Sequence, residues 1–174
     1  MSETAVNKSL NDLSATEVID LLGLEYLDGE GVWIKLLWRT PEANAIYGLL
    51  TDTDFSALHQ LHEIESWVHV AGAPIDMTIL HSDHSVTHQV IGQEVGSGQE
   101  PQFLVPKDAW QGSTSRGKWS LVVCMLAPPF SGFELARSEN DFTPWLNSRN
   151  DDKDRIGLVN RLKELIREGK NERK

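Results

Sequence analysis

The chain has 174 residues, a hydrophobic content of 40% and a formal net charge of −10, which fits one globular domain with a substantial core. This acidic balance argues against a binder of nucleic-acid backbones, which needs a basic surface, and it disfavours anionic membranes. The charge is uneven, because residues 1–149 hold 8 basic and 20 acidic residues, whereas residues 150–174 hold 8 basic and 6 acidic ones. We therefore expect no nucleic-acid or membrane partner, and a tail that differs from the body.

The cysteine content and the apolar runs bear on the compartment. Cys124 is the only cysteine, so an intrachain disulfide is impossible. It lies in an apolar run without a basic neighbour, which predicts a buried, inert thiol. The first residues show no basic-then-apolar signal pattern, and no apolar stretch approaches the ~18 residues of a membrane span. A cytoplasmic protein is the expectation.

The N-terminal part begins with a polar segment, residues 1–13, which is expected to be flexible. Ser14 and Glu17 have the spacing of a capping box, which predicts the start of a short helix. Gly23 is expected to end that helix, and the stretch 28–31 is expected to form a turn.

From Val32 onward the hydrophobic period is two, as in a β-strand. Further short strands are predicted at Ala45–Thr51, Ser56–His62, Ser66–Ala71, Ile75–His81, Val86–Gly92, Gln102–Pro106 and Trp119–Ala127. Gly96-Ser97-Gly98 and Gly112-Ser113-Thr114 are among the predicted turns. No helical period intervenes before Ala127, so the pattern excludes parallel βαβ winding and favours an all-β sandwich or barrel.

The basic tail has a helical pattern across Asp151–Gly169, with acidic residues in its first turn and Arg167 near its last. Its apolar stripe consists of Ile156, Val159, Leu162 and Ile166, with Leu158 and Leu165 beside them. An amphipathic helix that docks on its own body, or across a dimer interface, is predicted. A helix that recruits another protein is the alternative.

The stretch 55–72 carries the most informative polar residues. On regular strands its odd-numbered positions share one face, and these are His59, Leu61, Glu65, Trp67 and His69. The spacing is similar to the first motif of cupins, HxHx(3–4)E followed by six residues and glycine, with Leu61 in place of the second histidine. The segment 106–111 is similar to the second cupin motif, PxGxxH, with Gln111 in place of the histidine.

The chain resembles the small "cupin five" family, a domain of unknown function, over roughly residues 15–136. The shared positions are His59, Glu65, Trp67, Gly72, Pro74, Pro106, Trp110, Gln111, Gly112, Cys124, Ala127, Pro128, Phe130 and Phe133–Ala136. The resemblance implies a cupin double-stranded β-helix, or jelly-roll barrel, over residues 14–136, followed by an extension over 137–174, and it implies a homodimer. Gln60 and Val68 depart from the family's usual arginine and histidine, so no ligand specificity is transferred.

The resemblance leaves three kinds of site open. One is a divalent metal on His59, Glu65 and Gln111, although a neutral amide is a poor ligand. Another is a pocket for a small organic ligand in the barrel. Its expected walls and hydrogen-bonding groups are Tyr47, Trp67, Trp110, His59, Glu65, His69 and Gln111. Core packing is the alternative interpretation for Trp67, Trp110 and His69.

The third kind of site is acid–base catalysis by His59 and Glu65, as in cupin isomerases and epimerases. Epimerases of sugar nucleotides clamp a diphosphate with basic residues, whereas residues 45–136 hold three basic and ten acidic residues. A small, non-anionic organic ligand in the barrel, more readily without a metal than with one, is therefore predicted. An isomerase-like enzyme that uses His59 and Glu65 is the alternative.

Overall fold

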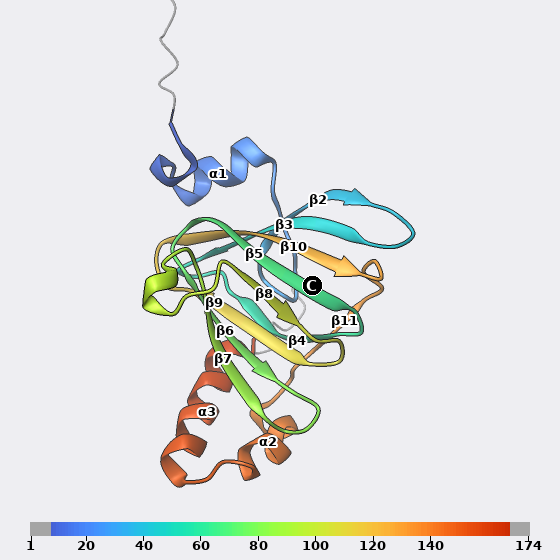
Figure 1. Cartoon of the computed structure of the whole chain (residues 1–174), viewed down its shortest axis with the longest axis vertical. Coiled ribbons are helices and arrows are strands. Elements are labelled where there is room, and N and C mark those ends of the chain that lie inside the picture. The colour runs from blue at the N-terminus through green and yellow to red at the C-terminus, as the bar shows by residue number, and fades with distance from the viewer. Residues whose placement is uncertain (1–7, 168–174) are drawn as a thin grey trace, which may run out of the picture.

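The computed structural model describes residues 8–167, whose strands form two antiparallel sheets that face each other (Figure 1). The six-stranded sheet has the order β1 (Glu25–Tyr26), β2 (Trp33–Arg39), β3 (Asn44–Thr51), β10 (Trp119–Ala127), β5 (Ile64–Gly72) and β8 (Gln102–Val105). The five-stranded sheet has the order β11 (Phe133–Leu135), β4 (Ser56–Leu61), β9 (Trp110–Ser115), β6 (Ile75–Leu80) and β7 (Val86–Ile91). The predicted all-β architecture is confirmed, but within residues 8–167 the two sheets do not close into a barrel.

The N-terminal helix α1 (Ala15–Leu22) lies on the outer face of the six-stranded sheet (Figure 1). The predicted capping box is present, since Ser14 Oγ accepts from the Glu17 N–H and Glu17 Oε2 accepts from the Ser14 N–H. Gly23 ends the helix in a left-handed conformation, with φ of 65°. The short 3₁₀ helix η1 (Leu10–Asp12) precedes α1, and Trp119 Nε1 donates to the Leu13 carbonyl at 3.1 Å. Leu10 and Leu13 of the segment expected to be flexible therefore pack against the sheet, while residues 1–7 lie outside the described part.

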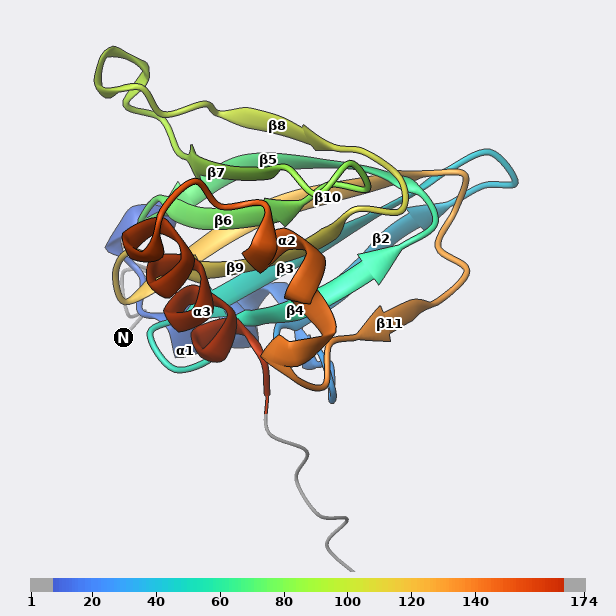
Figure 2. The same ribbon diagram turned by 90° about the horizontal axis from the view of Figure 1, so that it is seen from below.

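The C-terminal segments cover the outer face of the five-stranded sheet (Figure 2). They are the 3₁₀ helix η3 (Glu139–Phe142), α2 (Thr143–Asn147) and α3 (Asp152–Leu165). In α3, Leu158, Leu162 and Leu165 are buried and pack in one cluster with Leu58 and Leu80 of the sheet. The expectation that the tail helix docks on its own body is confirmed. None of the described helices is long and apolar enough to cross a membrane.

Two sequence-based boundaries are wrong. Gly112 is not part of a turn but lies inside β9, where a Cβ would meet Leu165 of α3 at 3.1 Å and the Leu58 backbone at 3.2 Å. The glycine therefore marks a close approach of the helix to the strand. Helix α3 ends at Leu165, so Arg167 lies beyond its last turn, and Gly169 lies outside the described residues.

Arg167 ties the end of the tail to the turn at residues 28–31. Its Nε donates to the Glu30 carbonyl at 3.2 Å, and its Nη2 donates to the carbonyls of Gly31 and Phe55 at 3.2 and 3.1 Å. The guanidinium carbon also lies 4.2 Å from the centre of the Phe55 ring. A Cβ at Gly31 would collide with this guanidinium. The tail therefore fixes a loop that precedes β2.

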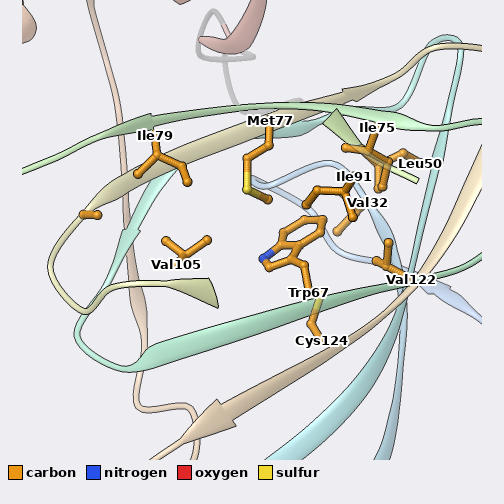
Figure 3. Packing of buried hydrophobic residues seen from close by; sticks show 11 residues of the cluster. Val32, Leu50, Trp67, Ile75, Met77, Ile79, Ile91, Val105, Val122 and Cys124 are labelled. Carbon is orange, nitrogen blue, oxygen red and sulfur yellow. The ribbon is translucent and has the colours of Figure 1, made fainter. Parts of the chain in front are cut away.

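The main core fills space between the two sheets (Figure 3). Leu50, Val122 and Cys124 of the six-stranded sheet meet Ile75 and Met77 of the five-stranded sheet around the ring of Trp67. The 3₁₀ helix η2 (Val95–Ser97) lies in the connection from β7 to β8. Because apolar side chains fill this space, a site between the sheets has to lie nearer β2 and β11.

Candidate ligand site between the sheets

A cavity of about 300 Å³ lies between the two sheets. Its lining comes from β2, β3, β10 and β5 of one sheet, from β4 and β11 of the other, and from two loops. Most of the wall is apolar, and it includes Ile34, Ile46, Leu50, Leu126 and Phe133. A concave, mainly apolar space of this size is typical of sites for small organic molecules.

Strand alternation brings two polar side chains into this cavity. His59 and Leu61 of β4, together with Glu65 and Trp67 of β5, line it, as the odd-numbered spacing predicts. His59 and Glu65 are only 2% and 5% exposed. Leu61, which stands where the cupin motif has its second histidine, contributes apolar surface instead.

Gln111 of β9 joins these two residues across the sheets. It is the register partner of His59, and its Nε2 donates to Glu65 Oε2 at 2.5 Å. Burial raises the pKa of Glu65 above its ordinary value. A positive charge on His59 would lower this pKa, whereas the negative charge of Glu30 raises it further. The N–H groups of Trp67 and Gln111 lower it. The Trp67 indole affects the Glu65 pKa without a hydrogen bond to the carboxyl group, since its Nε1 has no hydrogen-bond partner among the described residues. The protonated form of Glu65 is thus favoured by its surroundings.

The imidazole of His59 is held in one orientation. Its Nδ1 lies 2.7 Å from the Ala57 carbonyl oxygen, which can only accept, so Nδ1 carries a proton and donates it. Glu30 Oε1 lies 3.9 Å from the same nitrogen, and the ring meets Phe133 edge-on. Nε2 is therefore the nitrogen that remains for a ligand or a proton.

The residues of the expected metal set, His59, Glu65 and Gln111, lie close together. Within residues 8–167, no three His, Cys, Asp or Glu side chains are placed to share one metal ion. Gln111 directs its NH₂ group toward Glu65, so it presents no amide oxygen to a cation beside that carboxyl group. His59, Glu65 and Gln111 meet as a polar cluster centred on a hydrogen bond, and this arrangement does not fit a metal centre.

Three other predicted site residues lie away from the cavity. Tyr47 is on the opposite face of β3 and packs in the cluster under α1, while Trp110 packs edge-on against Phe142 near the C-terminal helices. The expectation that Tyr47 and Trp110 form the walls is therefore wrong for this cavity. His69 is buried farther along β5, where Nε2 donates to the Ala73 carbonyl at 2.9 Å, as a core histidine would.

Comparison with known proteins identifies the family and supports the fold. The family described as "Cupin superfamily (DUF985)", Cupin_5, matches residues 16–136. The chain belongs to the Cupin_5 family. No curated protein matches this Cupin_5 chain.

Solved structures support the cupin fold of this Cupin_5 chain. A protein from Shewanella oneidensis is 26% identical with a TM-score of 0.78, over 90% of this chain and 99% of that one. A hypothetical protein from Leishmania major is 21% identical with a TM-score of 0.77, over 90% and 100% of the two chains. A cupin-2 domain from Rhodospirillum rubrum is 13% identical with a TM-score of 0.56, over 80% and 90%.

Sequence reasoning missed several cavity residues of this Cupin_5 chain, above all Glu30. Glu30 lies in a turn between two glycines, where no hydrophobic period indicates which way a side chain points. Phe130 and Cys124 also line the cavity, and the only signal for them was their place in the family motif. Burial raises the pKa of the Cys124 thiol well above its ordinary value, so the thiol stays protonated.

Proposed function

We propose that this Cupin_5 protein binds a small, non-anionic organic molecule in the cavity between its sheets. The observation that carries this proposal is the cavity of about 300 Å³, whose apolar wall includes two buried polar side chains, His59 and Glu65. The apolar part offers surface for a hydrocarbon body, and the polar pair offers hydrogen bonds that fix its orientation.

The charges at the cavity disfavour an anionic ligand. Glu30 and Glu65 both line it, and Arg39 is the one lysine or arginine side chain that does so among the described residues. The Arg39 guanidinium already donates to the Phe130 carbonyl at 3.1 Å. A carboxylate or phosphate group near Glu30 would therefore meet a like charge, and among the described residues that line the cavity only Arg39 could offset it.

A thermal-shift screen of neutral and cationic metabolites tests this function. A ligand present at a hundred times its Kd should stabilise the protein by about 2.7 kcal/mol, which corresponds to roughly 5–10 °C for a domain of this size. The variant Ile46→Trp, which fills the cavity from β3, should abolish the shift. Tyr47→Trp is the matched control, because Tyr47 lies on the opposite face of the same strand.

Two outcomes would contradict the proposal. One is that no compound raises the melting temperature and no metabolite co-purifies with the protein. The other is that every hit keeps its full shift in Ile46→Trp while that variant remains folded by circular dichroism.

An acid–base isomerase is the second candidate, and one observation favours it. His59 presents Nε2 and Glu65 favours its protonated form in the same cavity, so one group can take a proton from a substrate while the other gives one. The proton gained by His59 and the proton lost by Glu65 are exchanged back between turnovers. If a hit is converted, His59→Ala should lower turnover by about 10²–10⁴-fold. Full turnover in that variant would exclude this mechanism.

A further inference from the structure

The polar lining of the cavity contains three hydrogen-bond acceptors, besides the donors Arg39 and Asn44. The acceptors are the carboxyl groups of Glu30 and Glu65 and the free Nε2 of His59. We propose that the ligand carries a protonated amine on a small apolar body, and that the ammonium group lies against the carboxylate of Glu30, with Glu65 beside it. This inference rests on the proposed function and narrows it to one chemical class.

Three of the protein's donors close to Glu30 and Glu65 are already engaged. Nδ1–H of His59 donates to Ala57, the amide NH₂ of Gln111 donates to Glu65, and the Ser56 hydroxyl donates to Glu30 Oε1 at 2.6 Å. An acceptor-rich ligand would find few free donors there, the buried Nε1–H of Trp67 being one of them. An ammonium group supplies three donors and a positive charge, which matches what the cavity offers.

Glu30 is held in place before any ligand arrives. Its carbonyl accepts from the Ala57 N–H at 2.9 Å and from Arg167 Nε at 3.2 Å, so the loop is fixed on two sides. With Oε1 engaged by Ser56, the other carboxyl oxygen receives no donor among the described residues. A fixed carboxylate with one free oxygen binds a cation without the entropy cost of ordering a loop.

The apolar and aromatic wall completes the match. Trp67, Phe130 and Phe133 line the same cavity, and aromatic faces attract organic cations while they accommodate a hydrocarbon chain. A cation that is partly removed from water therefore has both carboxylate and aromatic partners.

Isothermal titration calorimetry at neutral pH with hexylamine, hexan-1-ol and hexanoate tests the proposal, because the three probes share one hydrocarbon chain. Hexylamine should bind about tenfold or more tightly than hexan-1-ol, since bonds to charged groups are stronger. Glu30→Gln, which keeps the shape and the acceptor for Ser56, should weaken hexylamine about tenfold and leave hexan-1-ol unchanged. Glu42→Gln, in the exposed β2–β3 hairpin, is the matched control and should change neither.

Each other result has a definite meaning. If hexan-1-ol binds as tightly as hexylamine, the proposal of an amine ligand is overturned, while the proposed function stands. A preference for hexanoate overturns both the amine proposal and the proposed function, which requires a non-anionic ligand. If Glu30→Gln weakens the binding of hexylamine and hexan-1-ol equally, Glu30 only shapes the cavity, and the proposed ammonium contact is overturned. If none of the three probes binds, the amine proposal is overturned, and the metabolite screen alone decides whether the cavity binds a small, non-anionic molecule.

Discussion

Glu65 is a carboxyl group that the fold keeps out of water. Burial makes its charged form costly, and the single close hydrogen bond from Gln111 offsets only part of that cost. Such a group is a poor choice for stability alone, because an apolar residue of similar volume would carry no desolvation penalty. Its burial beside His59 supports the ligand site proposed above.

The raised pKa of Glu65 should make stability depend on pH. Between the unfolded value near 4.5 and the higher native value, the folded protein holds a proton that the unfolded chain releases. Stability should therefore fall as pH rises through this window, by up to about 1.4 kcal/mol per pH unit. Glu65→Gln should remove this loss in urea unfolding measured from pH 4 to 8. Identical pH profiles for the variant and the wild type would contradict the prediction, and Glu42→Gln should follow the wild type.

The sequence could predict part of the site at this scale. His59 and Glu65 come together because β4 and β5 follow each other in opposite sheets and each keeps a period of two, which the sequence pattern shows. Tyr47 could not be placed, since the cavity side of β3 carries even-numbered residues and nothing in the sequence links the faces of separate strands. Glu30 could not be found, because its position depends on contacts with Ser56 and Arg167, which are distant in the sequence.

At the scale of elements, eight of the eleven described strands were predictable, whereas β1, β9 and β11 and the packing between elements were not. Most strands between turn residues lie within a residue or two of the predicted ranges, since alternation and turn chemistry are local signals. Gly112 was misread because glycine marks both turns and close approaches, and the approaching Leu165 lies more than 50 residues later. Only the folded chain shows which meaning applies.

The packing of α3 makes a matched pair of substitutions informative. Leu162 is fully buried against the five-stranded sheet, whereas Ile156 on the same helix is 59% exposed. Leu162→Ala should lower the free energy of unfolding by about 2–5 kcal/mol, and Ile156→Ala by less than about 1 kcal/mol. Chemical denaturation of the full chain measures both. Equal effects would mean that α3 does not hold the sheet as described.

For the whole molecule, the helices leave part of one sheet uncovered. The C-terminal helices cover the five-stranded sheet, but α1 covers only one end of the six-stranded sheet (Figures 1 and 2). Beyond α1, a register row on the outer face contains Trp38, Met125 and Leu104, which are 45%, 38% and 54% exposed. No carboxylate lies in this row, although the chain has a net charge of −10. We propose that this face pairs with a second copy of the chain.

Light scattering coupled to size-exclusion chromatography tests this homodimer. The wild type should elute with twice the mass of one chain, and Trp38→Lys should shift it to the mass of one chain by burying an unpaired charge at the interface. Leu21→Lys, at an exposed position on α1, is the control and should remain dimeric. A monomeric wild type at micromolar concentration, or a dimeric Trp38→Lys, would rule out pairing through this face.

The single cysteine gives the protein a natural reporter. Cys124 lines the cavity and is almost wholly buried, so a reagent that reaches its sulfur in the folded state has to pass through that cavity. Because the thiol stays protonated, a small, uncharged thiol reagent should label the native chain slowly, and a compound that occupies the cavity should slow the labelling further. Compounds that protect the thiol can be ranked by mass spectrometry on the unmodified sequence, before anything is known of their chemistry.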